Sequence, residues 1–196
     1  MVDATGSMDA YWATAQEALA TAVDEIKSRT DIPIQVKVVA YRDMRYDGSQ
    51  SLLQSAWSDD SNYLKQWISE IQCGGGGDHP ESVGLGLEAI LQQQTSMTIL
   101  IGDAPGHTGS EGFKEATICG KEQSPIHALY ACQHGGVKEA WEKIAKLSGG
   151  KAFLLKPGLS GFTDVLKVLL LSNKKLMLDY SPVTEEGRQA KALLDK

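Results

Sequence analysis

The chain has 196 residues, with 42% hydrophobic and 22% charged side chains and a net charge of −6. That length suits one globular domain, and no apolar run reaches the 18 residues of a membrane-spanning helix. The net negative charge argues against nucleic-acid binding and is compatible with a bound cation. The chain opens Met1-Val2-Asp3 without a basic or apolar leader. We therefore expect no secretory signal and no membrane insertion, and we favour a cytoplasmic protein.

Three cysteines are present, at positions 73, 119 and 132, and none lies in a C-x-x-C pair. An odd number without metal-binding spacing predicts reduced thiols and no zinc ribbon. A single bridge between Cys119 and Cys132 stays open as an alternative.

Hydrophobic spacing predicts alternating helices and strands along the chain. In chain order we expect a helix at 8–27, strands at 34–41 and 52–57, a helix from Asp59 or Asp60 to Ile71, a loop at 73–80, a helix at 83–91, a strand at 97–101, a loop at 104–125, a strand at 126–132, a helix at 137–147, a strand at 152–155, a helix at 162–171 and a helical or frayed tail at 182–196. The strand at 52–57 is expected to run antiparallel to the strand at 34–41.

Alternating strands and helices predict an α/β fold with a mostly parallel sheet, one antiparallel edge strand and helices on both faces. In such sheets the working site lies beyond the carboxyl ends of the strands. Three polar segments are expected there, at Asp3–Ser7, Asp78–Glu81 and Asp103.

The first segment reads Asp3-Ala4-Thr5-Gly6-Ser7. In an extended turn, alternate side chains point the same way, so one carboxylate and two hydroxyls can converge. These oxygen donors suit Mg²⁺ or Mn²⁺, and two neutral hydroxyls hold the ion without neutralising it. The plainer alternative is a hydroxyl cap at the start of the following helix.

The other two segments supply further carboxylates. Four glycines at 74–77 precede Asp78-His79-Pro80-Glu81, and Gly102-Asp103-Ala104-Pro105 follows a buried strand. A helix start with Asp78 as cap and Pro80 in the first turn accounts for the acids, but not for the four glycines. A turn before proline is the alternative for Asp103.

Together the D-x-T-G-S motif, Tyr41-Arg42-Asp43, the G-G-G-D-x-P-E motif and the strand followed by G-D-A-P resemble a von Willebrand factor type A domain with a metal-ion-dependent adhesion site. The resemblance covers residues 1–172, leaving 173–196 as a tail or a strand or helix extension. Its motifs are most similar to the alpha-kinase-linked and integrin beta I-like types. It implies a Rossmann-like three-layer sandwich that binds Mg²⁺, Mn²⁺ or Ca²⁺ and a partner's acidic side chain. The metal residues it implies are Asp3, Thr5, Ser7, Asp78, Glu81 and Asp103.

Two features depart from that family. The extra calcium site of integrin beta domains uses acids where this chain has Ala10 and Tyr11, so we do not expect that site. The family's first central strand precedes the first aspartate, and here only two residues do, so we expect that strand to be truncated. Lys175–Tyr180 is the candidate to fill its place, from the same chain or by strand exchange in a homodimer.

Four further side chains are expected near the site, two histidines in loops and an Arg-Asp pair at the end of a strand. His79 and His107 flank the site in loops and are ligand-surface candidates, although solvated loop residues are the commoner outcome. Arg42 and Asp43 end a strand nearby. We expect them to pair with each other, with a place at the rim of the ligand surface as the alternative.

The sequence therefore predicts a binding module that captures a protein partner in cell adhesion or another interaction, and not an enzyme. The chain has no P-loop, no G-x-S-x-G elbow, no P-C-x-x-C after His79-Pro80-Glu81, and Thr5 where a dehalogenase-type phosphotransferase needs its second acid. Two alternatives remain: a regulatory module of a larger enzyme such as an alpha-kinase or a metal-chelatase complex, and a structural domain with a vestigial site.

Overall fold

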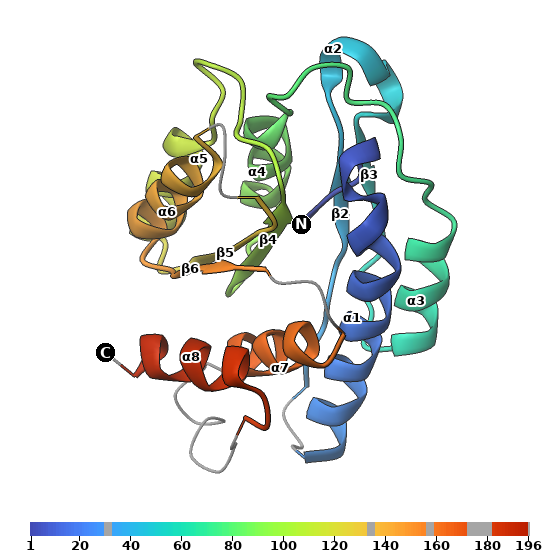
Figure 1. Ribbon diagram of the computed structural model, residues 1–196, viewed down its shortest axis with the longest axis vertical. Helices are drawn as coiled ribbons and strands as arrows, with labels where there is room; N and C mark the ends of the chain where they lie inside the picture. The colour runs from blue at the N-terminus through green and yellow to red at the C-terminus, as the bar shows by residue number, and fades with distance from the viewer. Residues whose placement is uncertain (30–32, 133–135, 156–158, 172–181, 196) are drawn as a thin grey trace. The chain divides into compact units, whose positions relative to one another are not determined.

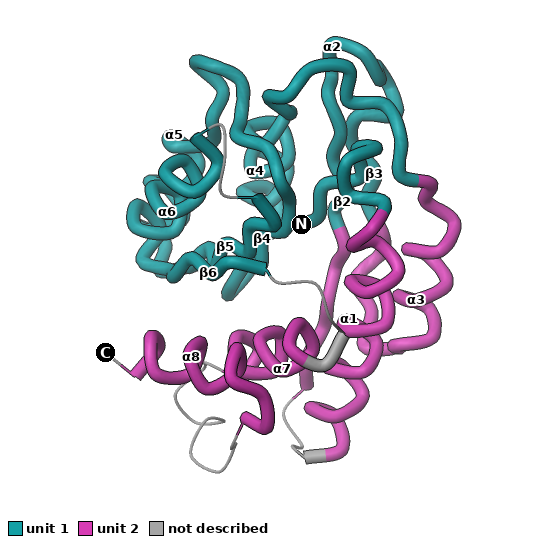
Figure 2. Tube along the Cα trace, viewed as in Figure 1, with its two compact units in different colours: residues 1–9, 39–54, 73–155 teal, residues 10–38, 55–72, 156–196 magenta. Residues whose placement is uncertain are grey.

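The computed structural model describes residues 1–29, 33–132, 136–155, 159–171 and 182–195. The chain divides into two compact units, shown in Figure 2. Unit 1 comprises Met1–Asp9, Val39–Gln54 and Cys73–Leu155, and unit 2 comprises Ala10–Val38, Ser55–Gln72 and Lys156–Lys196. Every site residue predicted from the sequence belongs to unit 1.

Unit 1 is built on a six-stranded sheet with the order β3-β2-β1-β4-β5-β6 (Figure 1). The strands are β1 (Val2–Asp3), β2 (Val39–Tyr41), β3 (Leu52–Gln54), β4 (Thr98–Gly102), β5 (Ile126–Tyr130) and β6 (Ala152–Leu154). All neighbours pair in parallel except β2 and β3, which are antiparallel. The predicted α/β class, the mostly parallel sheet and its antiparallel edge strand are confirmed.

The short strand β1 lies in the middle of this sheet. Val2 pairs with Ala40 of β2 on one side and with Ile101 of β4 on the other. The backbone N–H of Ile101 also donates a hydrogen bond to the Met1 carbonyl at 3.0 Å. Two residues therefore occupy the position of the central strand. Lys175–Tyr180, the segment suggested to fill it, lies outside the described residues.

Helices α4 (Val83–Leu91), α5 (Phe113–Lys121) and α6 (Val137–Ser148) supply the helical part of the unit 1 core. Their inward positions follow the helical period and are apolar, so they bury one face against the sheet. The core contains Val83, Leu87 and Ile90 of α4, Ala116 and Cys119 of α5, and Trp141, Ile144 and Ala145 of α6, with Leu100, Ile126 and Ala128 from the strands. None of the three cysteines is in a disulfide bond.

Helix α5 corrects the loop expected at 104–125. Its buried residues, Ala116 and Cys119, are small and give a weak periodic signal. Gly120, which looks like a helix breaker in the sequence, is required by packing instead. A Cβ added there would lie 2.4 Å from the Leu147 carbonyl oxygen, so α5 approaches α6 closely only because the residue is glycine.

Short helices flank the sheet edge in unit 1: α2 (Met44–Asp47) and the 3₁₀ turns Gly6–Met8 and Gly48–Gln50. Unit 2 contains most of α1 (Asp9–Arg29), with α3 (Ser61–Ser69), α7 (Leu159–Leu170) and α8 (Glu185–Leu194). Asp60 caps α3 by accepting from two backbone N–H groups, which fixes the predicted start of that helix. None of the helices in the described ranges has the length and apolar character needed to span a bilayer.

Candidate metal centre

The polar residues of unit 1 gather where parallel strands end. β1 ends at Asp3, β2 ends at Tyr41 shortly before Asp43, and β4 ends at Gly102 directly before Asp103. Because β1 pairs with both β2 and β4 in parallel, these three ends share one edge of the sheet. The position is the one expected for a site in an open α/β fold.

The loop after β1 is held together by its own side chains and by Asp103. Thr5 donates to Asp3 Oδ1 twice, from its backbone N–H at 2.9 Å and from its hydroxyl at 2.7 Å. The hydroxyl oxygens of Thr5 and Ser7 lie 3.2 Å apart. Ser7 donates to Asp103 Oδ1 at 3.0 Å, so the structure brings these four predicted residues together.

Glu81 joins this group from the segment before α4. Its backbone N–H donates to the Pro105 carbonyl at 2.9 Å, which ties it to the loop after β4. A Cβ added to Gly76 would lie 2.8 Å from Glu81 Oε1 and 3.2 Å from Thr5 Cβ. The glycine loop thus passes between the two side chains where no larger residue fits. We call Asp3, Thr5, Ser7, Glu81 and Asp103 the first cluster.

Two carboxyl oxygens of the first cluster are buried without compensation. Asp3 Oδ2 and Glu81 Oε2 have no hydrogen-bond partner among the described residues, and neither does the buried hydroxyl of Tyr41. Burial, with the nearby charge of Asp103, raises the pKa of Asp3 to about 7. Burial, with the charges of Asp3 and Asp43, raises the pKa of Glu81 to about 9. None of the five residues of the first cluster carries a positive charge that would offset these acids.

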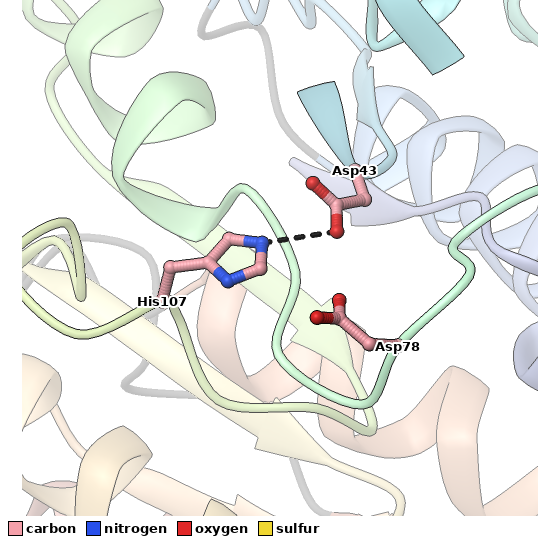
Figure 3. A group of neighbouring side chains, drawn as sticks. All are labelled: Asp43, Asp78 and His107. Atoms are coloured by element: carbon pink, nitrogen blue, oxygen red, sulfur yellow. Dashed lines mark hydrogen bonds and ion pairs between the residues drawn. The ribbon is translucent and has the colours of Figure 1, made fainter. Parts of the chain in front are cut away.

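A second cluster lies at the same edge and consists of Asp43, Asp78 and His107 (Figure 3). Asp43 Oδ2 and His107 Nε2 are 3.0 Å apart, and one ligand atom from each of the three residues lies within 4.8 Å of the others. Among the described residues, Asp3, Glu81 and Asp103 do not form a group this compact. The second cluster is therefore a possible metal-binding triad.

Local hydrogen bonds fix the orientation of Asp43. Its Oδ1 accepts from the backbone N–H of Arg45 at 2.9 Å, which caps α2, and from the Ser82 hydroxyl at 3.5 Å. Burial by itself would raise the pKa of Asp43. The hydrogen bonds with the Arg45 N–H, His107 and Asp78 outweigh that effect and lower the pKa below its ordinary value.

The placement of the predicted residues differs from expectation at several positions. His107 is buried, with 7% of its surface exposed, so its expected role as a solvated loop residue is wrong. His79 is exposed, as expected. Asp78 was grouped with Glu81 but lies beside Asp43 and His107, with Arg45 Nη1 at 3.8 Å.

Two members of the second cluster, His107 and Asp43, are not among the metal ligands expected from the sequence. For Asp43 the sequence predicts pairing with Arg42, whereas the Asp43 carboxylate contacts His107 and the start of α2. The sequence did contain a signal for a place in the site, because Asp43 follows the end of a predicted strand. That strand lies next to the strand that leads to Asp3.

No family model and no curated protein matches this chain at the sequence level. Solved structures do match. Proximal thread matrix protein 1 from the mussel byssus aligns with a TM-score of 0.64 and 18% identity over 87% of this chain and 45% of that chain. BatB from Bacteroides thetaiotaomicron aligns with a TM-score of 0.63 and 13% identity over 85% of this chain and 93% of that one. The human COPII-coat protein Sec24c aligns with a TM-score of 0.61 and 10% identity over 85% and 31%.

This chain therefore spans less than half the length of the mussel protein that it matches. One structure of that mussel protein is described as having a zinc-occupied MIDAS motif, the metal-ion-dependent adhesion site; it aligns with a TM-score of 0.62 and 17% identity over 85% of this chain and 43% of that one. Identities of this size establish the fold alone. The chain has the fold of von Willebrand factor type A domains, the fold that its sequence motifs predict.

Proposed function

We propose that the protein is a divalent-metal-dependent binding module that captures an acidic side chain of a protein partner. In this proposal the first cluster holds Mg²⁺, with Mn²⁺ or Ca²⁺ as substitutes. The observation that carries the proposal is the hydrogen-bonded arrangement of Asp3, Thr5, Ser7 and Asp103, with unpartnered carboxyl oxygens beside it. Asp78, the sixth ligand expected from the sequence, belongs to the second cluster instead.

The residues present fit a hard cation. Every side-chain donor of the first cluster is an oxygen, from three carboxylates and two hydroxyls, which is the donor set that Mg²⁺ and Ca²⁺ prefer. Buried carboxylates without partners are costly unless a positive charge is close. Asp3 Oδ2 and Glu81 Oε2 are two such atoms, and a dication would satisfy both.

The hydroxyls of Thr5 and Ser7 suit the proposed binding of an acidic partner because they carry no charge. They coordinate without adding negative charge, so the bound ion would keep an electrophilic position for a carboxylate from outside. Ser7 is exposed and Asp103 is half-buried, whereas Asp3 and Glu81 are buried. In this proposal Ser7 is therefore the neutral donor on the solvent side, where a partner can reach the ion, while Thr5 coordinates from the buried side.

The solved structures of the same fold support a role in binding. A coat protein and a thread matrix protein are structural proteins by their names, and one of them has a zinc-occupied adhesion motif. His79, exposed next to Asp78, remains our candidate for the rim of the partner surface. Strand exchange in a homodimer also remains a prediction.

Arrays of synthetic peptides with a central Asp, and matched arrays with Asn at that position, would test the proposed function. We expect Asp peptides to bind in Mg²⁺ and to lose binding with EDTA, with the Asn replacement and with Ser7→Ala. Thr108→Ala is the matched control, because Thr108 is an exposed hydroxyl residue in the loop that follows Asp103. Peptide binding that persists in EDTA, or that does not distinguish Asp from Asn, would refute the proposal.

A further inference from the structure

We propose that Asp43, Asp78 and His107 form a second metal site, which takes a borderline dication such as Zn²⁺. This site shares no residue with the first cluster and does not rest on the proposed function. Its donor set differs in kind, because an imidazole nitrogen joins two carboxylate oxygens. Mixed nitrogen and oxygen ligands favour zinc and similar transition metals over Mg²⁺ or Ca²⁺.

The spacing of Asp43 and His107 already matches that of two ligands on one ion. Ligands bound at about 2.0–2.1 Å in a tetrahedral site lie about 3.3 Å apart, and Asp43 Oδ2 is 3.0 Å from His107 Nε2. Asp78 completes the group within 4.8 Å. It is exposed and follows the glycine loop, so a small movement of its side chain closes the remaining distance.

Electrostatics in this cluster also indicate a cation. Two carboxylates held this close repel each other unless a proton or a positive ion lies between them. The Arg45 guanidinium approaches Asp78 only from outside, at 3.8 Å, and its side chain is 61% exposed, so the solvent screens much of its charge. A dication bound among the three residues would offset both acids at once.

The buried ligands are held in place by neighbouring groups. Arg45 N–H and Ser82 occupy Asp43 Oδ1, which leaves Oδ2 directed at His107 as drawn in Figure 3. Ser82 is itself fixed, because its hydroxyl oxygen accepts from the Met44 N–H at 2.8 Å. The backbone N–H of His107 donates to the Glu81 carbonyl at 3.3 Å. Such support is what orients ligands in protein metal sites.

Three protein ligands leave a fourth position of a tetrahedral ion for water or a partner group. Because Asp78 is exposed while Asp43 and His107 are buried, that position faces the solvent on the Asp78 side. The second site therefore lies at the surface, where an ion can exchange.

The test uses the chelator-treated full chain labelled with ¹⁵N at the histidine rings, titrated with Zn²⁺ in excess Mg²⁺ that fills the first cluster. We expect the ring nitrogens of His107 to shift while those of His79 and His127 stay unchanged. This measurement needs no substitution, so misfolding cannot confuse it. Shifts at other histidines only, or no shift at all, would overturn the proposal.

Calorimetry on variants supplies the second measurement. Asp78→Asn, at an exposed position that tolerates change, should weaken Zn²⁺ binding at least about tenfold, the smaller end of what disturbing a metal site costs. Asp59→Asn, an exposed carboxylate in unit 2, is the control and should bind as the unmodified chain does. Ser7→Ala should leave Zn²⁺ binding in Mg²⁺ intact, which separates this site from the proposed function. Equal Zn²⁺ affinity in Asp78→Asn and the unmodified chain would contradict the assignment.

Discussion

The Ser7 hydroxyl donates a hydrogen bond to Asp103 Oδ1 at 3.0 Å, although the two residues are 96 positions apart in the sequence. The bond joins the loop after β1 to the loop after β4. Through Thr5 the same chain of hydrogen bonds reaches Asp3. Two distant motifs of the sequence are thus parts of one polar cluster, and removing one hydroxyl should affect all of it.

Ser7→Ala should weaken Mg²⁺ binding at least about tenfold, the order of loss seen when a metal site loses a polar group. The substitution removes a neutral oxygen donor and frees the Asp103 carboxylate. Stability should change little, because Ser7 is exposed. Isothermal titration calorimetry with Mg²⁺ measures the effect, with Thr108→Ala as the control. Equal heats for Ser7→Ala and the unmodified chain would show that Ser7 is not a ligand.

The stabilisation that Asp3 and Glu81 give the metal-free protein should decrease as the pH rises from about 5 to 9. The pKa of Glu81 is raised from 4.5 to about 9 and that of Asp3 from 3.8 to about 7, in both cases chiefly by burial. The folded state therefore holds these protons more tightly than the unfolded chain does. The resulting stabilisation is complete below pH 4 and disappears as the pH passes the folded values.

Glu81→Gln should flatten that decline, most clearly between pH 7 and 9, because glutamine cannot ionise. From pH 7 to pH 9 the melting temperature of the variant should rise relative to that of the unmodified chain by at least about 2–4 °C, the shift that 1 kcal/mol produces in a domain of this size. Excess Mg²⁺ should flatten the decline in the unmodified chain as well. Parallel pH profiles for the two proteins would be inconsistent with a buried, proton-holding Glu81.

Gly76→Ala should destabilise the protein by about 1–3 kcal/mol, the cost of a strained backbone position. Gly76 has φ of +95°, and an added Cβ would lie 2.8 Å from Glu81 Oε1. Gly74→Ala is the matched control, because a Cβ there meets nothing within 4 Å, and it should change stability by less than about 0.5 kcal/mol. Urea denaturation compares the two. Equal losses at both positions would mean that the loop is not packed as described.

Trp141→Phe should cost about 1–3 kcal/mol, the penalty for a buried polar group left unpaired. The indole N–H of this fully buried residue donates to the Ala104 carbonyl at 3.0 Å and so anchors the loop that follows Asp103. Mg²⁺ affinity should fall along with stability, since that loop presents Asp103. The exposed Trp57 is the control for replacing an indole with a phenyl ring, and Trp57→Phe should leave the urea midpoint unchanged. An unchanged midpoint for Trp141→Phe would argue against the anchor.

The sequence predicted the parallel sheet, its antiparallel edge and the meeting of the first motif with Asp103, because each followed from a strong local pattern. The apolar strand that ends at Asp103 and the alternating donors of Asp3, Thr5 and Ser7 needed no knowledge of distant packing. The four glycines also gave a usable signal. Three of them, Gly75 to Gly77, adopt positive φ values, which other residues rarely do.

Other features depended on contacts that no local pattern shows. The sequence predicts a loop where α5 lies, because the buried residues of this helix are small and Gly120 resembles a helix breaker. Only the close approach to the Leu147 carbonyl explains that glycine. A solvated side chain is the commoner expectation for His107 because loop histidines are usually exposed, whereas Asp43, 64 positions away, lies against its ring. Burial and pairing across such separations are set by the fold, so a single sequence cannot show them.

A crystal of the protein soaked in Mn²⁺, with anomalous scattering recorded at the manganese edge, tests the central claim most directly. We expect an anomalous peak within coordination distance of the Thr5 and Ser7 hydroxyl oxygens, beside Asp3, Glu81 and Asp103. A crystal with no manganese there, or with manganese only at Asp43, Asp78 and His107, would contradict it.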